Sequence, residues 1–437
     1  MNLFPPADET IEGVGRALRD GRLTCVGLLG LCLARIDDRE ADVRAWVVVD
    51  REGAARQAAG LDADLASGLD RGPLHGIPLG IKDIVDVEGL PTAAGAKQWA
   101  KGAAADDAEV VARLRAAGAV ILGKTVTTAY AWVDPAVTHN PWDLDRTPGG
   151  SSSGSAAALA SGMCLGAIGT QTGGSIVRPS SYCGIAGFKP RFGENPTRGV
   201  VPLAEHLDHP GPMARCVADL IHLQRVLAPS SDFEAKDDAP PRVLVAAWML
   251  QRAEDSMRRA FDRALEALDR AGATMIGVAD PLPFEEILAD YRKIVAVEAA
   301  HVHAARMAEL PGDYPPRIRL LVEEGLKVAA DDYRVARERQ EALRSAGSRI
   351  DGDLLAAPAT MGAAPDRTTT GDPSMNAPFS FLGLPVVTFP VGLSAEGLPL
   401  GIQLAGIGPR AGSSAATLRA AAWCERVVRE GFATSFA

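Results

Sequence analysis

The chain has 437 residues, of which 47% are apolar and 23% charged, proportions typical of a folded, water-soluble protein. Its formal net charge of −10 argues against nonspecific binding to nucleic acid or anionic membranes. No stretch is apolar for long enough to predict a membrane span, and the first residues lack a basic region followed by an apolar segment. We therefore expect no nucleic-acid or membrane partner and a cytoplasmic location.

The N-terminal half alternates between helix and strand signals. We expect two helices within 8–37, the second capped by Thr24, then a β-branched strand at 45–50 and an alanine-rich helix to about residue 68. The segment at 77–89 predicts a strand and a turn. Residues 107–125 predict a helix, a stop at Gly118 and a buried strand, which together form half of a parallel α/β unit.

The texture changes in the second half. Between about 250 and 350 the pattern predicts long, charged, amphipathic helices. The runs DLLAAPAT, GLPVVTFPVGL and PLGIQLAG then predict strands, and a final helix opens on a serine. Both ends of the chain therefore have α/β character, and the segment between them, at about 250–350, is predicted to be helical; we call it the helical excursion.

Cysteine and histidine provide no metal-binding pattern. The six cysteines are scattered without a Cys-x-x-Cys pair, and the seven histidines form no cluster with ligand spacing. Several cysteines lie in apolar runs, so we expect buried thiols of a reduced protein.

A serine- and glycine-rich stretch, TPGGSSSGSAAALASG, occupies residues 147–162. Such a composition is typical of flexible linkers, and a linker here would leave the backbone near residue 150 open to proteases. The stretch nevertheless continues at once into an alanine-rich helix suited to close packing. We therefore interpret it as a rigid turn that holds its hydroxyl groups in fixed places.

Lys82 ends an apolar run in GIPLGIKDIVD. A lysine in such a place often extends its amine to the surface. Held in an apolar site, the same amine has a lowered pKa and can act as a neutral base. This segment alone leaves both interpretations open.

A third segment, GTQTGGSIVRP at 169–179, places Ser175 directly after two glycines. Consecutive glycines let neighbouring backbone N–H groups point into one small space, which suits an oxyanion. Most Gly-Gly-Ser turns have no catalytic function, so this segment indicates a site only in combination with the two segments described above.

Together the three segments resemble the amidase signature family, most strongly over about 74–190 and most weakly over about 225–350. The resemblance implies an α/β fold in which a large mixed β-sheet core is flanked by helices on both faces. It implies a single domain over 1–437, with a helical layer at about 280–345 that caps the substrate.

The resemblance also assigns the chemistry. Ser175 matches the nucleophile, Ser151 the bridging serine and Lys82 the lysine of a Ser–cis-Ser–Lys triad, with the cis peptide at Gly150–Ser151. It implies hydrolysis of a carbon–nitrogen bond, other than a peptide bond, through a seryl acyl-enzyme and without metal or cofactor. The oxyanion would bind the backbone N–H groups of Thr172, Gly173, Gly174 and Ser175.

Two positions depart from the common family pattern. Gln171 stands where many members have Asp, and Val177 stands where many have Arg, with Arg178 one place later. The triad is unaffected, but the roles of Gln171 and Arg178 stay open. The other hydroxyls of the serine turn are expected to cap the following helix or to satisfy the turn: Ser152, Ser153 and Ser155.

The substrate pocket is less well defined. Tyr130 and Trp132 lie in the region that borders the acyl pocket in the family, and Ile176 follows the nucleophile. We expect at least one of the two aromatics to line the pocket, the alternative being that both are core aromatics. Tyr291 and Tyr333, in the helical layer, are further candidates.

The substrate class stays open, because a small linear amide, an aryl amide, a carbamate and a urea-like compound would all suit one triad. Two alternatives also stand: the glutaminase-type subunit of an amidotransferase, which would bind a partner protein, and a catalytically silent family member. The resemblance favours a homodimer.

Overall fold

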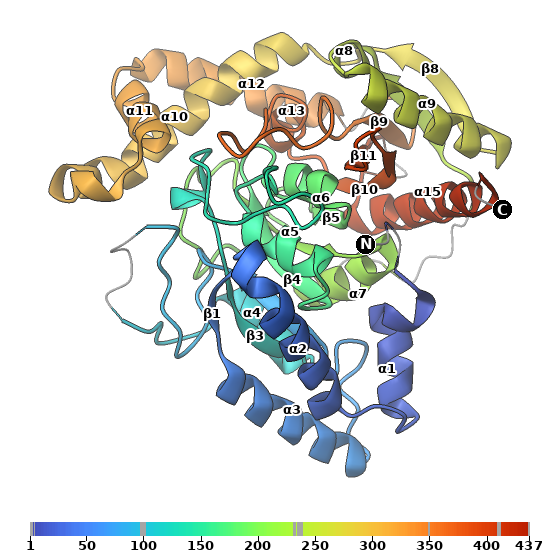
Figure 1. Ribbon diagram of the computed structural model, residues 1–437. Coiled ribbons are helices and arrows are strands. Elements are labelled where there is room, and N and C mark those ends of the chain that lie inside the picture. Colours follow the sequence, from blue (N-terminus) through green and yellow to red (C-terminus); the bar gives the residue numbers. More distant parts are fainter. Residues whose placement is uncertain are drawn as a thin grey trace.

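The protein is described by a computed structural model that covers residues 3, 5–96, 102–229, 233, 239–347, 350–408 and 412–435 (Figure 1). Within this part of the chain, eleven strands form one sheet. They are β1 (Trp46–Val49), β2 (Pro78–Lys82), β3 (Val120–Thr125), β4 (Gly166–Gln171), β5 (Ala186–Lys189), β6 (His209–Ala214), β7 (Arg242–Ala246), β8 (Thr274–Ala279), β9 (Leu354–Pro358), β10 (Val386–Leu393) and β11 (Pro399–Gly406).

The sheet is mixed, with the strand order β1–β3–β2–β4–β6–β5–β10–β11–β9–β7–β8. The groups β3–β2–β4 and β9–β7–β8 are parallel, and the other neighbours are antiparallel. In the first group Ile81 of β2 pairs with Ile168 of β4. The carboxyl ends of these two strands therefore lie at the same edge of the sheet, which is where open α/β sheets carry their sites.

Helices cover both faces of this sheet. The strands β10 and β11 are buried almost throughout, as strands packed on two faces are. The helices α5 and α6 form one group, in which α6 packs on β10 and β11. The helices α7, α9 and α15 form another group, in which α15 packs on the same two strands. Their bounds are α5 (Ser153–Ala160), α6 (Val177–Cys183), α7 (Val217–Leu227), α9 (Asp255–Arg270) and α15 (Ser414–Ser435).

The N-terminal elements form as the sequence predicts. Thr24 caps the second helix, where its hydroxyl accepts a hydrogen bond from the N–H of Gly27. Gly118 adopts a positive φ between a helix and β3, and β3 runs parallel to β2. The helices are α1 (Ile11–Arg19), α2 (Cys25–Val43), α3 (Arg51–Ala66) and α4 (Glu109–Ala116).

The helical excursion is interrupted by a strand that the sequence pattern does not reveal. Strand β8 at Thr274–Ala279 lies inside the segment expected to be helical, and it pairs with β7. Beyond it, α10 packs against three other helices, and Figure 1 places this group at the top of the view. These helices are α10 (Phe284–Glu309), α11 (Pro316–Gly325), α12 (Ala330–Gly347) and α13 (Ala377–Phe381); the short α8 (Ala247–Gln251) precedes α9.

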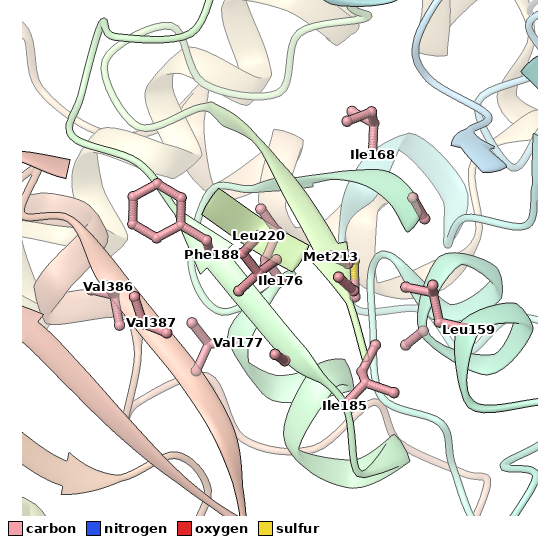
Figure 2. Packing of buried hydrophobic residues seen from close by; sticks show 14 of the residues in the cluster. Leu159, Ile168, Ile176, Val177, Ile185, Phe188, Met213, Leu220, Val386 and Val387 are labelled. Carbon is pink, nitrogen blue, oxygen red and sulfur yellow. The ribbon is translucent and has the colours of Figure 1, made fainter. Parts of the chain in front are cut away.

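The apolar core lies around the middle of the sheet (Figure 2). Ile176 and Val177 follow the glycine turn directly, and their side chains point among core residues of β5 and β10. Both are fully buried. The turn before them is therefore anchored on its carboxyl side by two core residues. All six cysteines are unpaired and buried, as the apolar runs around several of them predicted.

Candidate active site

Lys82 is the last residue of β2, and its side chain is fully buried. Its Nζ lies 2.7 Å from Oγ of Ser151 and 2.8 Å from Oγ1 of Thr170. Thr170 stands near the carboxyl end of β4, the parallel neighbour of β2. The lysine thus extends into the interior rather than to the surface, and two hydroxyl groups meet its amine there.

Burial lowers the pKa of the Lys82 ammonium group well below its ordinary value, and the negative charge of Asp208 opposes that effect. Among the described residues, no carboxylate forms a hydrogen bond or ion pair with this amine. The neighbouring strand offers a contrast, because Lys124 of β3 is also buried but forms an ion pair of 2.9 Å with Asp83. Lys82 therefore has the surroundings of a neutral amine.

Ser151 lies in a turn whose backbone is held from two sides. The Gly150–Ser151 peptide is cis. The carbonyl oxygen of Gly150 accepts a 2.7 Å hydrogen bond from Nη2 of Arg178, and that of Ser151 accepts one of 3.2 Å from the N–H of Thr128. The serine turn is thus part of the packed interior, and a flexible linker is excluded.

The other hydroxyls of the turn do not cap the following helix. Ser153 Oγ donates to the carbonyl of Gly149 at 2.7 Å and so satisfies the turn, as expected. Ser152 Oγ instead bonds with the backbone of Thr170 in β4, and Ser155 Oγ with Thr125 Oγ1 in β3. These two hydroxyls therefore connect α5 to the neighbouring strands β4 and β3.

Ser175 ends the glycine turn and is only 6% exposed. Across the described residues, no acceptor takes a hydrogen bond from the backbone N–H groups of Thr172, Gly173, Gly174 or Ser175. The next two N–H groups, those of Ile176 and Val177, both donate to Oε1 of Gln171. Four successive backbone N–H groups therefore have no acceptor among the described residues.

Gln171 organises this turn, which gives a physical reason for its departure from Asp. Its Oε1 accepts from Ile176 and Val177 at 2.9 and 3.0 Å, while its Nε2 donates to Oγ of Ser380 at 3.1 Å. Ser380 in turn donates to the carbonyl of Gly173 at 2.7 Å. An aspartate could accept the first two bonds, but only an amide both accepts and donates.

Both glycines of the turn are required by close approach of side chains. A Cβ on Gly173 would lie 2.6 Å from Oη of Tyr291, and one on Gly174 would lie 2.4 Å from Oδ1 of Asn376. Neither of these two oxygens has a hydrogen-bond partner in the part of the chain that the structure describes. They are buried, unpartnered polar atoms beside the glycine turn.

Arg178 lies on α6 and is buried, so its guanidinium group contacts the serine turn and does not reach the surface. Besides Gly150, its Nη2 bonds with Oγ1 of Thr370 at 3.4 Å. Its Nε and Nη1 have no partner among the described residues. Burial lowers the pKa of the guanidinium group.

The expected pocket residues occupy different places. Tyr130 and Trp132 are both buried, and Oη of Tyr130 donates to Asp313 at 3.0 Å while its ring stacks on Tyr314. Tyr333 bonds with Glu298 instead. Tyr291 stands beside Gly173, as described above, whereas Ile176 is a fully buried core residue (Figure 2).

Sequence reasoning missed four residues of the site: Thr170, Asp208, Asn376 and Ser380. Thr170 could have been found, because it lies beside Lys82 once β2 and β4 are recognised as parallel neighbours. The other three come from other segments of the chain, and their contacts with the turn depend on the tertiary structure.

The described residues hold no group of three or more histidine, cysteine, aspartate or glutamate side chains placed to bind a metal ion. Within the same residues, no helix has both the length and the apolar character that crossing a membrane requires.

Comparison with known proteins is consistent across sequence and structure. A family model described as Amidase matches residues 28–410. A Mycobacterium tuberculosis protein named "Putative amidase AmiD" is 35% identical over 440 residues, covering 90% of this chain and 89% of that protein. A glutamyl-tRNA(Gln) amidotransferase subunit of Roseiflexus sp. is 34% identical over 457 residues, covering 91% and 92%. A solved structure described as "Crystal structure of amidase" has a TM-score of 0.87 and 33% identity, covering 95% of this chain and 99% of that one.

Proposed function

Because the chain belongs to the amidase family and is an amidohydrolase acting on carbon–nitrogen bonds, we propose that it hydrolyses a small linear amide, carbamate or urea-like compound through a seryl acyl-enzyme. Ser175 is the nucleophile, and Ser151 and Lys82 relay protons. One observation carries the proposal: a buried amine without a carboxylate partner lies 2.7 Å from Ser151, at the edge of the sheet that also holds the glycine turn.

The hydrogen bonds of Lys82 suit a base. A neutral amine has two N–H donors and one lone pair. The hydroxyl and carbonyl oxygens of Thr170, at 2.8 and 3.4 Å, can take the two donors. The lone pair is then left for the O–H of Ser151.

Acylation moves one proton along this relay. As Oγ of Ser175 attacks the substrate carbonyl carbon, its proton passes to Ser151 Oγ, and the proton of Ser151 passes to Lys82. The carbonyl oxygen becomes an oxyanion, which the N–H groups of Thr172 to Ser175 stabilise. The carbon–nitrogen bond then breaks, and the leaving nitrogen takes the proton back through Ser151. The product amine departs, and the acyl group remains as an ester on Ser175.

Deacylation reverses the same path with water as the nucleophile. Lys82 and Ser151 take a proton from the attacking water, and Ser175 regains it when the ester bond breaks. The acid product leaves and the relay returns to its first state.

The remaining expectations belong to this proposal. The helices α10–α12 cap the substrate, and Tyr291 is the pocket residue best supported by its position, because its hydroxyl lies beside Gly173 and has no partner among the described residues. Tyr130, Trp132 and Ile176 contribute to the walls through packing. The enzyme works as a homodimer of single-domain protomers in the cytoplasm, and its six unpaired, buried thiols support a reducing location.

A substrate panel tests the proposal. It contains p-nitroanilides, aryl carbamates, simple carboxamides and free glutamine, and it compares the wild type with Ser175→Ala and Lys82→Ala. Activity on one class that both substitutions abolish is the expected result. The matched control is Ser161→Ala, which removes a hydroxyl at the end of α5. Activity that survives Ser175→Ala would refute the assigned nucleophile.

One comparison favours a second candidate, a glutaminase that passes ammonia to a partner protein. The relative from Roseiflexus sp. belongs to an amidotransferase and is nearly as similar to this chain as the mycobacterial protein. Hydrolysis of free glutamine by wild type, with no activity on the other panel members, would support this candidate. A folded wild-type protein that is silent on the whole panel and takes up no serine-directed reagent would support the catalytically silent alternative.

A further inference from the structure

Asp208 lies directly opposite the start of the glycine turn. Strands β4 and β6 are antiparallel, and their register pairs Gln171 with His209. Thr172, which follows β4, therefore faces Asp208, which precedes β6. Their side chains meet: Oγ1 of Thr172 donates to Oδ1 of Asp208 at 2.5 Å.

The second carboxylate oxygen is also bound, so the side chain has one orientation. Oδ2 of Asp208 accepts hydrogen bonds from the N–H groups of Leu203 and Ala204, at 2.8 and 3.0 Å. Three donors on two separate segments thus hold the carboxylate against Thr172. Because the N–H of Thr172 is the first of the four unpartnered N–H groups, the position of this residue helps to set the direction in which they point.

The same carboxylate acts on the lysine of the relay. Among the described residues, Asp208 is the charged group that opposes the effect of burial on Lys82. Lys82 must hold a positive charge, in a fully buried place, each time it takes the proton of Ser151. The negative charge of Asp208, which three hydrogen bonds hold in one orientation, lowers the free energy of that cationic state.

We propose that Asp208 is a positioning residue for the reaction: its carboxylate fixes Thr172 at the start of the oxyanion turn and supplies the negative charge that stabilises Lys82 as an ammonium ion. This inference rests on the proposed function, since it assigns Asp208 a task in the relay. The two effects, on the position of Thr172 and on the charge of Lys82, can be separated by experiment, because a substitution of Thr172 removes only the first.

The other titratable groups that face Asp208 lie on helix α10. They are Glu298, whose negative charge raises the pKa of Asp208, and Tyr291, whose own pKa is raised partly by Asp208. Burial is the main cause that raises the pKa of Asp208, to about 6. The carboxylate is therefore ionised above about pH 6 and can oppose the loss of the proton from Lys82 there.

The test uses a fluorophosphonate, which reacts with activated serines and needs no knowledge of the substrate. The rate of Ser175 labelling is measured between pH 5 and pH 10 for the wild type, Asp208→Asn, Thr172→Val and Thr172→Ser. In the profile of labelling rate against pH, we expect Asp208→Asn to lower the plateau rate by about tenfold or more, because Lys82 becomes a weaker base. For the same reason, the fall of the rate on the acid side of the profile (the acid limb) should move to lower pH. Thr172→Val should lower the plateau without moving the limb, and Thr172→Ser, which keeps the hydroxyl, should retain most of the rate.

Glu205→Gln provides the matched control, since Glu205 is an exposed acid three residues away on the same loop. It should change neither the plateau nor the limb. An Asp208→Asn profile that keeps both the rate and the limb of wild type would overturn this inference alone, as would an equal limb shift in Thr172→Val. Absence of labelling at Ser175 in the wild type would overturn the proposed function together with it. If Asp208→Asn fails to fold, Thr172→Val and Thr172→Ser still decide whether Thr172 positions the turn.

Discussion

Nη2 of Arg178 donates a 2.7 Å hydrogen bond to the carbonyl oxygen of Gly150, so the cation that follows Ser175 by three residues supports the turn that carries Ser151. This bond joins the two motifs on which the candidate site depends. It also gives Arg178 the structural place that the sequence left open.

Replacing Arg178 should separate activity from stability. Arg178→Met removes the bond to Gly150, and we expect kcat/KM to fall at least about tenfold because the serine turn loses its support. The guanidinium is buried with two nitrogens unpartnered among the described residues, so its removal should offset much of the cost of leaving the carbonyl of Gly150 without a donor, and Tm should change little. Activity on the panel substrate and a thermal scan measure the two effects.

The control for that experiment is Arg198→Met, which removes a surface arginine whose side chain is 71% exposed. It should change neither quantity. A large fall in Tm for Arg178→Met, in proportion to its loss of activity, would mean that Arg178 acts mainly as a structural residue.

Lys82→Met should abolish most activity and stabilise the protein. Loss of the base should lower kcat by about 100-fold to 10,000-fold. Burial lowers the pKa of Lys82 in the folded state. Below the pKa of lysine in the unfolded chain, the unfolded state therefore binds more protons than the folded state. The free energy of unfolding of the wild type falls as the pH falls below that pKa. The stability gain of Lys82→Met should therefore be larger at pH 7 than at pH 10, and it should vanish as the pH rises past the pKa of an ordinary lysine.

Urea unfolding at pH 7 and pH 10 measures this difference. Lys293→Met, on a lysine whose side chain is 42% exposed, is the control that should show no such gain. A variant less stable than wild type at pH 7 would contradict the neutral, buried amine.

Gln171 should contribute more to the free energy of unfolding than its neutral side chain suggests. Gln171→Leu leaves the buried N–H groups of Ile176 and Val177 without an acceptor, and each orphaned group costs about 1–3 kcal/mol of stability. Ser380→Ala removes only the link from Gln171 to the carbonyl of Gly173, so it should cost less. Equal losses in the two variants, measured by urea unfolding, would show that the helix start does not depend on Gln171.

The ion pair of Lys124 and Asp83 should dominate the stability of this edge of the sheet. Both side chains are almost fully buried, so Lys124→Met leaves an uncompensated carboxylate and should cost about 3–5 kcal/mol. The double variant Asp83→Asn with Lys124→Met removes both charges and should recover much of that loss. Denaturation midpoints of the single and double variants decide this, and a double variant no more stable than Lys124→Met would contradict the account.

The sequence was most informative where one residue type has few structural uses. Lys82 at the end of an apolar run had two interpretations, and the buried amine beside Ser151 selects the second. Thr24 and Gly118 perform the cap and stop expected of them, because those functions depend on local backbone geometry alone.

Strands made of small residues escaped prediction. β4 has the sequence GAIGTQ and β6 the sequence HPGPMA, neither of which shows β-branched alternation. Their glycines serve packing instead: a Cβ on Gly166 would lie 2.8 Å from the side chain of Leu79, and one on Gly169 would lie 2.8 Å from Met213. Such strands are defined by what they must fit between, which is a property of the whole fold.

Residues that act through distant contacts escaped for a related reason. Asp208 and Ser380 reach the glycine turn from other segments of the chain, so their contacts with it depend on the tertiary structure.

The central claim is that Ser175 forms the covalent intermediate with the help of Lys82 and Ser151, and mapping a fluorophosphonate adduct by mass spectrometry tests it most directly. The account predicts one adduct on the wild type, located on Ser175, absent from Ser175→Ala and formed far more slowly in Lys82→Ala and Ser151→Ala. An adduct on Ser152 or another serine, or one that forms on Ser175→Ala at the wild-type rate, would contradict it.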